Sequence, residues 1–350
     1  MLPNTRLKFN SFTQRLADLN GVKNAKEQFT VTPAVEQKLE EKIMLSSEFL
    51  QKINVIGVEE LKGEKVLLGS GSTIAGRTNT DSKDRAPAPI ASLDNDGYEL
   101  AHTDFDTYIP YSLLDSWARF PDFQGRITNV ITKQIALDRI MIGFNGTTVA
   151  ATTDRTAYPL LQDVNVGWIE KIKTKKSESV AKDIIIGENG HYKNLDACVR
   201  DAVNTYIAEQ YQDDTDLVVI CGRKLLDDKY LQIINNNNDA TDKVATDMLL
   251  TNKNLGGLPA IRVPYFPANA MLITSLSNLS LYFQTGKRRR TIIDYPKRNR
   301  IEDYQSSNEG YVVETYDKVA YVENITLSDE LPASVDETDE TDETDETSAE

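Results

Sequence analysis

The chain has 350 residues, of which 40 % are hydrophobic and 27 % are charged, and its formal net charge at pH 7 is −15. A chain of this length can form two or three hydrophobic cores, and no apolar run approaches the roughly 18 residues of a membrane-spanning helix, which excludes an integral membrane protein built of helices. Nine acidic residues and no basic residue lie in the last twenty positions, so the rest of the chain keeps a net charge of −6. A phosphate backbone would repel even this part, which argues against a general nucleic-acid-binding protein.

The first 29 residues carry a net charge of +3 and one apolar helical face. They lack the continuous apolar stretch of a secretory signal, so residence in the cytoplasm is expected. We interpret this segment as a terminal helix docked on the body; the alternative is a detachable arm that binds an acidic or apolar partner. Cys198 and Cys221 lie in apolar patterns and are predicted to be buried and reduced.

A second helix is predicted to begin at Pro33, with Thr32 as its N-cap. Its apolar residues recur every three or four positions as far as Ile53, which forms one narrow seam for packing on the body or on a partner. The residues from Asn54 to Glu60 are predicted to form a strand.

The region between residues 64 and 111 is predicted to be an extended loop. Two extended pieces, Lys65–Gly69 and Glu99–Tyr111, flank about 29 residues rich in Gly, Ser, Thr, Asn, Asp and Pro. From His102 to Ile109 two sets of residues alternate with the period of two that is typical of a strand. Because a long two-stranded arm with a polar tip cannot bury itself, we expect it to contact another subunit.

The longest predicted helix runs from Phe123 to Phe144. Its apolar stripe repeats about every 3.6 residues and includes Ile127, Ile131, Ile135 and Met141. At about 1.5 Å per residue this helix is a rod of roughly 33 Å, which is long for a globular domain. We interpret it as a spine that holds the elements on its two sides at a fixed distance.

Beyond the spine helix the chain is predicted to form a compact α–β–α subdomain around one buried strand, Asp216–Cys221. A helix capped by Asn194 and reaching Tyr211 precedes this strand. Four consecutive asparagines, Asn235–Asn238, mark an exposed loop at its edge. Short β-patterned segments between Ile261 and Thr326 then predict an antiparallel sheet. The acidic tail, with four Asp-Glu-Thr repeats, is predicted to be disordered.

Motifs that carry chemistry are weak in this chain. His102 and His191 are far apart and lack the spacing to Cys or carboxylate ligands that a metal site needs. The Gly-rich segments Gly69–Gly71 and Gly143–Gly146 do not match a phosphate-binding loop and are interpreted as turns. No catalytic residue, cofactor or metal is therefore predicted, and the chain is not expected to be an enzyme.

A basic cluster lies between residues 287 and 300. Phosphate contact is one interpretation. The interpretation we prefer is that these side chains pair with carboxylates of a neighbouring subunit, because a planar guanidinium matches a carboxylate with two hydrogen bonds. The candidate intersubunit contacts are Lys287, Arg288, Arg289, Arg290, Arg298 and Arg300.

Eight short segments in a fixed order carry a resemblance. They are TRLKFNSF (5–12), FTVTPAV (29–35), KGEKV (62–66), WARFPDFQGRI (117–127), LDRIMIGFNG (137–146), LLQDVNVGW (160–168), DLVVICGRKLLDDKY (216–230) and GLPAIRVPYFPANAMLIT (257–274). Together they resemble the major capsid proteins of P2-like tailed bacteriophages, from about Thr5 to Val322. The acidic tail departs from the pattern of that family.

The resemblance implies an α+β fold, the Hong Kong 97-type major capsid fold. Its implied parts are a basic N-terminal segment over 1–29, an N-terminal arm over 30–63, an extended hairpin loop over 64–111, a peripheral domain with the spine helix over 112–165 and 262–327, an axial domain over 166–261, and a disordered acidic tail over 328–350. The resemblance further implies that residues 1–29 are removed on maturation, with the junction at Phe29 and Thr30.

The implied function is that of a structural protein that self-assembles into pentamers and hexamers of an icosahedral head around packaged double-stranded DNA. The implied partners are other copies of the chain, an internal scaffolding protein, a phage protease and a portal protein, without sequence-specific contact to DNA and without a membrane. Assembly in the host cytoplasm and residence in the virion capsid follow. The alternatives are a small-molecule enzyme of unknown chemistry and a nucleic-acid-binding factor that uses the bases from Lys287 to Arg300.

Overall fold

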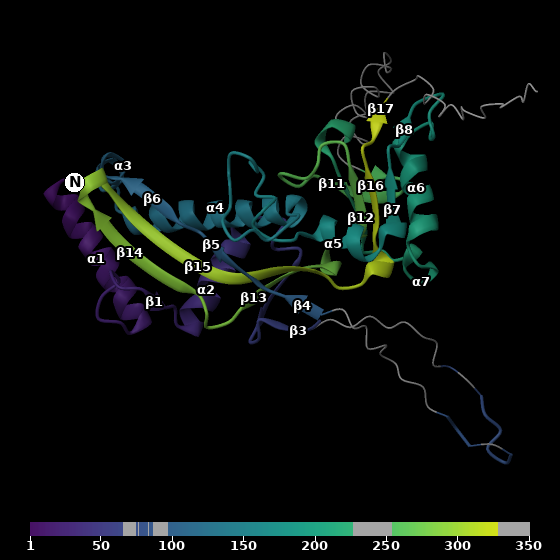
Figure 1. Cartoon of the computed structure of the whole chain (residues 1–350), viewed down its shortest axis with the longest axis horizontal. Coiled ribbons are helices and arrows are strands. Elements are labelled where there is room, and N and C mark those ends of the chain that lie inside the picture. Colours follow the sequence, from purple (N-terminus) through teal and green to yellow (C-terminus); the bar gives the residue numbers. More distant parts are fainter. Residues whose placement is uncertain (66–74, 76, 83, 87–96, 227–253, 328–350) are drawn as a thin grey trace, which may run out of the picture.

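The computed structural model describes residues 1–65, 75, 77–82, 84–86, 97–226 and 254–327, and two sheet-based units make up this part of the chain (Figure 1). A seven-stranded sheet organises the long unit, and a six-stranded sheet organises the second unit. The core of the long unit continues beneath the second sheet, because it includes Ile220, Leu272 and Tyr321 of that sheet. The two units therefore share buried apolar surface.

The long unit contains α1 (Pro3–Asn20), β1 (Phe29–Thr30), α2 (Pro33–Leu45), β2 (Asn54–Val58), β3 (Lys62–Glu64), β4 (Gly97–Glu99), β5 (Ala101–Asp104), β6 (Thr107–Pro110), α3 (Tyr111–Trp117), α4 (Phe123–Asn145), α5 (Trp168–Lys175), β13 (Leu279–Gln284), β14 (Arg289–Tyr295) and β15 (Arg300–Val313). The second unit contains β7 (Val180–Lys182), β8 (Ile185–Ile186), α6 (Leu195–Tyr206), α7 (Glu209–Gln212), β9 (Leu217–Cys221), β10 (Asn254–Leu255), β11 (Leu258–Ile261), β12 (Met271–Ser275), β16 (Ala320–Glu323) and β17 (Thr326–Leu327). Short 3₁₀ turns lie at Ser177–Ser179, Leu276–Asn278, Pro296–Arg298 and Tyr316–Lys318.

The sheet of the long unit has the order β1-β14-β15-β13-β2, with β5 and β6 also paired to β15. Its buried residues Ile292 and Ile301 share one core with Ile131 and Ile135 of α4 and with Ile43 of α2. Figure 1 shows α4 running along this sheet towards the second unit. The sheet therefore supports the long helix over much of its length.

The sheet of the second unit has the order β10-β11-β9-β12-β16-β7. All five residues of β12 are buried, because both faces of the strand are covered. Met271 and Ile273 pack in one core with Val199 of α6, while Leu272 points into the core of the long unit. A strand covered on both faces is expected to be continuously apolar, which holds for Met271, Leu272 and Ile273, whereas Thr274 and Ser275 at its end are polar.

The predicted spine helix is confirmed as α4, which extends one residue further than the predicted range. Ile127, Ile131 and Ile135 are buried along it, whereas Met141 is half-buried and lines a surface groove. The prediction of a single apolar face thus holds for three of these four residues and is weaker for Met141.

Trp168 closes the end of α4 nearest the second unit. The indole is fully buried, and its Nε1 donates to the carbonyl oxygen of Ser280 at 2.9 Å. The ring lies directly on Gly143, where an added Cβ would come within 2.2 Å of a ring carbon. Glycine at this position therefore lets the tryptophan pack against the helix backbone, a role that the prediction of a turn at Gly143–Gly146 did not include.

Most of β15 was missed by sequence reasoning, because the last of the β-patterned segments, EGYVVETYDKVAYVENI, begins only at Glu309. Its residues are largely polar, yet many are buried: Glu302, Asp303, Gln305, Ser306, Ser307 and Glu309. The backbone is satisfied on both sides, because Arg300 to Asp303 pair with β14 and with β6. Polar side chains within a doubly paired strand do not produce the apolar pattern that sequence reasoning depends on.

The predicted division of the chain is wrong for the late strands. We assigned all of 262–327 to the unit of the spine helix, but β12 pairs with β9 and β16 pairs with β12 in the second sheet. The late strands are also not all antiparallel, since β13 pairs with β2 in parallel and β11 pairs with β9 in parallel. The apolar pattern of a strand does not reveal which sheet it joins.

Two elements predicted in the N-terminal third have different bounds in the structure. The second helix ends at Leu45 and not at Ile53, although Leu50 and Ile53 are buried. The stem of the predicted hairpin is β3 with β4, and Ala101 to Pro110 pair with β15 instead of forming a free arm. The first predicted piece, Lys65–Gly69, lies outside the described residues beyond Lys65, as do the loop at Asn235–Asn238 and the tail at 328–350.

The capped helix of the second unit is confirmed at its start. The side-chain oxygen of Asn194 accepts a hydrogen bond from Ala197 N at 2.8 Å. The helix itself ends at Tyr206 and is followed by the separate short helix α7. The buried strand predicted at Asp216–Cys221 is confirmed as β9, and Cys198 and Cys221 are buried free thiols, as expected.

The contact between Gly143 and Trp168 can be tested against a second glycine in the same helix. Gly143→Ala is expected to destabilise the protein by about 1–3 kcal/mol, because the new methyl group overlaps a ring that has no room to move. Gly125→Ala is expected to stabilise it by up to about 1 kcal/mol, because nothing lies within 4 Å of the added Cβ. Urea unfolding followed by circular dichroism measures both, and equal effects of the two substitutions would contradict the packing argument.

Candidate functional site

Five charged side chains form one buried cluster where α2, α4 and the sheet meet. We call it the Arg139 cluster; its members are Glu36, Glu40, Arg139, Arg288 and Glu309, and none exposes more than 5 % of its surface. Arg139 donates to Glu40 at 2.7 and 3.0 Å and to Glu309 at 2.6 and 3.0 Å. Arg288 donates to Glu40 as well. The cluster therefore ties the helix after the N-terminal segment to the spine helix and to β15.

The cluster holds three carboxylates against two guanidinium groups, and the carboxylates are not equivalent. Burial opposes the charge of Glu40, but Arg139 and Arg288 outweigh it and lower the pKa of Glu40. Burial likewise opposes the charge of Arg139, while Glu309 and Glu40 raise the pKa of Arg139 well above its usual value. For Glu36 burial dominates and raises the pKa. Glu36 is thus the least compensated charge in the cluster.

Some polar atoms of the cluster have no hydrogen-bond partner among the described residues. They are Oε1 of Glu36 and the Nε and Nη2 atoms of Arg288. The other carboxylate oxygen of Glu36 accepts from Gly286 N at 2.7 Å. Glu36 therefore acts mainly as a cap for the turn before β14, whereas Glu40 carries the ionic contact.

Sequence reasoning missed this cluster, although the sequence carries a signal for it. Arg139 interrupts the apolar stripe of the spine helix between Ile135 and Ile140. Glu36 and Glu40 stand one turn apart on the side of their helix that also buries Ile43. A charge on an apolar helical face indicates a buried partner, but only the tertiary structure shows which carboxylates meet the arginine.

The candidate junction, Phe29 and Thr30, forms β1 at the edge of the large sheet. Phe29 pairs with Arg290 and Thr30 pairs with Arg289 of β14. Phe29 is buried in the core of the long unit and Thr30 is exposed. The preceding helix α1 is docked on the same unit through Phe9 and Leu16, which confirms the interpretation of a docked terminal helix in this chain.

Three of the candidate intersubunit arginines already pair with carboxylates of their own chain. Arg288 is buried in the Arg139 cluster, so its prediction as an intersubunit contact is wrong. Arg290 donates to both carboxylate oxygens of Asp303 at 3.0 and 2.6 Å, and Arg300 Nε donates to Glu302 at 2.7 Å. All three arginines thus pair with carboxylates of the same chain: Arg288 with Glu40 of α2, and Arg290 and Arg300 with residues of β15.

The remaining three candidates are exposed. Lys287 lies on the turn before β14, and Arg289 is the first residue of that strand. Arg298 lies on the turn between β14 and β15. The assignment of these three residues to intersubunit contacts stays a prediction.

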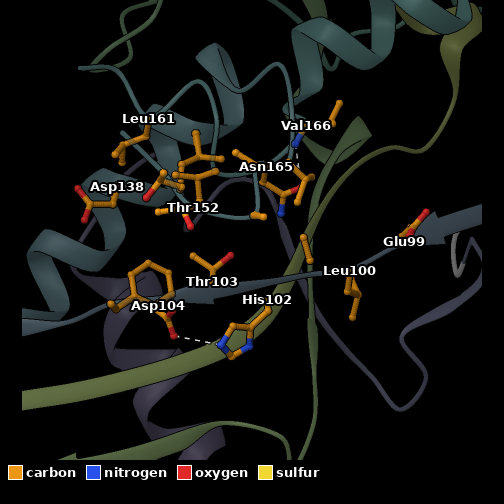
Figure 2. A pocket seen from close by; sticks show the side chains of 18 of the residues that line it. Glu99, Leu100, His102, Thr103, Asp104, Asp138, Thr152, Leu161, Asn165 and Val166 are labelled. Carbon is orange, nitrogen blue, oxygen red and sulfur yellow. Dashed lines mark hydrogen bonds and ion pairs between the residues drawn. The ribbon is translucent and has the colours of Figure 1, made fainter. Parts of the chain in front are cut away.

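A groove of about 930 Å³ runs between β5 and the segment 149–155 (Figure 2). Thr152, Leu161 and Asn165 line one wall, and Asp138 lies at one end. Burial raises the pKa of Asp138, whose carboxylate accepts from Gln134 at 2.7 Å. The groove is open and mainly apolar.

Both histidines are held by polar neighbours. His102 Nε2 lies 3.1 Å from Oδ1 of Asp104, which is two residues further along the exposed side of β5. His191 Nδ1 accepts from Ile185 N at 3.0 Å. Within the described part of the chain, no group of three or more His, Cys, Asp or Glu side chains is placed to hold a metal ion. No helix in the same part is long and apolar enough to span a membrane.

The two glutamates of α2 allow a matched test of the Arg139 cluster. Glu40→Gln is expected to destabilise the protein by about 3–5 kcal/mol, because it leaves two buried guanidinium groups with one charged partner fewer. Glu36→Gln is expected to change stability by less than about 1 kcal/mol, since it removes a poorly compensated charge and keeps an acceptor for Gly286 N. Chemical unfolding of both variants at pH 7 measures the difference, and equal losses would contradict the assigned roles.

The pH dependence of stability should separate the same two residues. The pKa of Glu40 is lower in the folded state than in the unfolded chain, so its contribution is present above about pH 4.3 and is lost as the pH falls through the folded value. The pKa of Glu36 is raised, so its ionisation lowers stability as the pH rises above about 4.3. Unfolding measured between pH 3 and pH 7 should therefore show a weaker acid loss for Glu40→Gln than for the wild type, and a steeper one for Glu36→Gln.

Comparison with known proteins finds relatives that match nearly the whole chain. The family model described as phage major capsid protein, P2 family, matches residues 8–325. A protein of Escherichia phage P2 described as capsid proteins is 44 % identical over 344 residues, which cover 94 % of this chain and 96 % of that protein. The major capsid protein of Serratia phage KSP20 is 39 % identical over 338 residues, covering 93 % of this chain and 97 % of the relative.

A solved structure supports the same relationship. A chain from the procapsid of satellite phage P4, in a structure that includes the size determination (Sid) protein, superimposes with a TM-score of 0.79 at 43 % identity. The match covers 94 % of this chain and 99 % of that chain. The expected α+β fold of the Hong Kong 97 type is thereby confirmed. The chain belongs to the P2 family of phage major capsid proteins, the structural proteins that form the shell of the phage head.

Proposed function

We propose that copies of this chain assemble into the pentamers and hexamers of an icosahedral head that encloses packaged double-stranded DNA. The observation that carries this proposal is the hairpin stem formed by β3 and β4. The described residues further out, at 75, 77–82 and 84–86, are exposed, and Figure 1 shows them away from both sheets. Because an extended hairpin without cover is unstable alone, another subunit is its natural support.

The parts of the subunit follow from this assignment, with bounds revised from those expected. The long unit would be the peripheral domain, with α4 as its spine. The second unit would be the axial domain, completed by β12 and β16 from the late part of the chain. The stem at β3 and β4 would begin the extended loop, and α2 would belong to the N-terminal arm.

The charge of the chain fits a container for DNA. Its net charge is −15, and three of the six candidate basic residues are paired with carboxylates of the same chain. Only three bases of this cluster therefore remain for phosphate, and the net negative charge repels it, so the packaged duplex would stay mobile inside the shell. The same observation disfavours a nucleic-acid-binding factor built on residues 287–300.

Maturation would involve partners that the single chain does not contain. These are an internal scaffolding protein, a portal protein and a phage protease that removes residues 1–29 by cutting between Phe29 and Thr30, all within the host cytoplasm before the head becomes part of the virion. The location of the junction between two anchored helices, α1 and α2, supports this assignment. Intact residues 1–29 in mature heads, measured by mass spectrometry, would overturn it.

Assembly itself is tested by co-expression. The chain is produced with the scaffolding protein of its own phage, and the products are examined by electron microscopy and sedimentation. Closed shells of uniform diameter are expected. A protein that stays monomeric with the scaffold and at every concentration and salt tested would overturn the proposal.

The exposed bases near β14 offer a more specific prediction. Reversing the charge at Lys287, Arg289 and Arg298 together, each to Glu, is expected to lower the yield of shells by about tenfold or more, because like charges placed opposite each other cost several kcal/mol at an interface. The melting temperature of the monomer should stay the same, since these side chains are exposed. A variant with Glu at the exposed positions Lys38, Lys42 and Lys133 has the same charge change and serves as the control; equal yields from the two variants would contradict the prediction.

A further inference from the structure

We propose that release of β1 from β14 is the step that controls proteolytic removal of residues 1–29. This inference rests on the proposed cleavage between Phe29 and Thr30. We call residues 25–31 the latch, because they hold the junction on the edge of the large sheet. The inference concerns how the junction becomes a substrate, and not whether the shell forms.

The junction cannot enter a protease in its present conformation. Proteases bind their substrates as extended strands, with backbone hydrogen bonds and with side chains held in pockets. In the latch one backbone edge of Phe29 and Thr30 already pairs with β14. The side chain of Phe29 exposes only 8 % of its surface and lies in the core of the long unit. The segment must therefore leave the sheet before the peptide bond can reach a catalytic site.

Several contacts close the latch on both sides of the junction. Before it, the carbonyl oxygen of Ala25 accepts from Ile292 N at 2.9 Å, and Ala25 is 1 % exposed. After it, Val31 N donates to the carbonyl oxygen of Arg288 at 2.9 Å. The latch is thus a short run of edge-strand contacts together with three buried side chains, Ala25, Phe29 and Val31.

The elements on the two sides of the latch are anchored separately. On the N-terminal side, Lys8 of α1 donates to Ala118 O at 2.7 Å, and Phe9 and Leu16 are part of the core. On the C-terminal side, α2 is held by the buried ion pairs of Glu40 in the Arg139 cluster. The latch can therefore open as a local unit while both helices stay docked.

Local opening makes cleavage sensitive to the stability of the latch alone. When opening and closing are fast compared with cleavage, the cleavage rate follows the population of the open form. A change that favours the paired β1 should slow cleavage, and a change that weakens the pairing should speed it. The core of the folded subunit need not unfold in either case.

A reversible cross-link across the latch is the most direct test. The bond from Val31 N to Arg288 O places Thr30 and Arg289 at the next, non-hydrogen-bonded pair, where opposite Cα atoms are about 4.5 Å apart and a disulfide can form. Both side chains are exposed, and the native Cys198 and Cys221 are buried. Oxidation of the double variant Thr30→Cys with Arg289→Cys should therefore join only these two positions.

Assembled shells of this variant are treated with the phage protease and, separately, with chymotrypsin, which cuts after aromatic residues. Cleavage at Phe29–Thr30 is followed by mass spectrometry. We expect the oxidised form to be cut at least about tenfold more slowly than the reduced form, and reduction of the same sample to restore the cleavage rate. Equal rates before and after reduction would overturn the inference.

A second pair of variants tests the opposite direction. Ala25→Asp places a charge in the buried side of the latch and is expected to speed cleavage by about tenfold or more. Asn24→Asp is the matched control, because Asn24 is exposed and an aspartate can still accept the hydrogen bond from Lys26 N. Its cleavage rate should stay close to that of the wild type, and equal rates for the two variants would count against the latch.

The two proteases separate this inference from the proposed function. If the phage protease cuts no peptide bond N-terminal to Pro33 in wild-type shells, the proposed junction is wrong. The effect of the disulfide on chymotrypsin still decides whether the latch protects the bond.

Discussion

The burial of Arg139 is the constraint on which the rest of the structure depends. A guanidinium in the middle of a long apolar helix can leave water only if carboxylates meet it with good geometry. Glu40 comes from α2 and Glu309 from β15, so satisfying Arg139 brings three distant parts of the chain to one point. An apolar side chain would pack there in several ways, whereas five polar donors in a rigid fork accept few arrangements.

This constraint links the two units. Glu309 lies in the strand that spans the long unit, and Asn165 donates to its backbone carbonyl at 2.9 Å just before the chain turns into α5. Trp168 then packs between Gly143, Phe144 and Tyr311, with edge-to-face contacts to the two aromatic rings. The core continues from there beneath the second sheet. A shell subunit must present its contact regions at a fixed separation, and a continuous core of this kind supports that separation.

The N-terminal third combines two kinds of attachment. The helix α2 is held by buried charge pairs, which are costly to break because each partner would be left unpaired in the interior. The segment before it is held by apolar side chains, by two residues of edge strand, and by partly exposed polar contacts such as those of Arg6 with Asp294 and Lys8 with Ala118 O, which can separate in small steps. The boundary between the two lies close to Val31. The segment whose removal we propose is thus attached by apolar, edge-strand and partly exposed polar contacts, whereas the arm that would remain is attached by buried ion pairs.

The sequence by itself determined those features that depend on local pattern. The period of the apolar residues identified α4 nearly to the residue, Asn194 identified a helix start, and the run ending at Cys221 identified a buried strand, because each depends on neighbours within a few positions. The order of short motifs identified the family. Only the tertiary structure decided the partners of charged residues, the buried polar strand β15, and the sheet to which β12 and β16 belong. Such choices depend on contacts between residues far apart in the chain: Arg288 looked like a surface base until Glu40, 248 positions away, was found beside it.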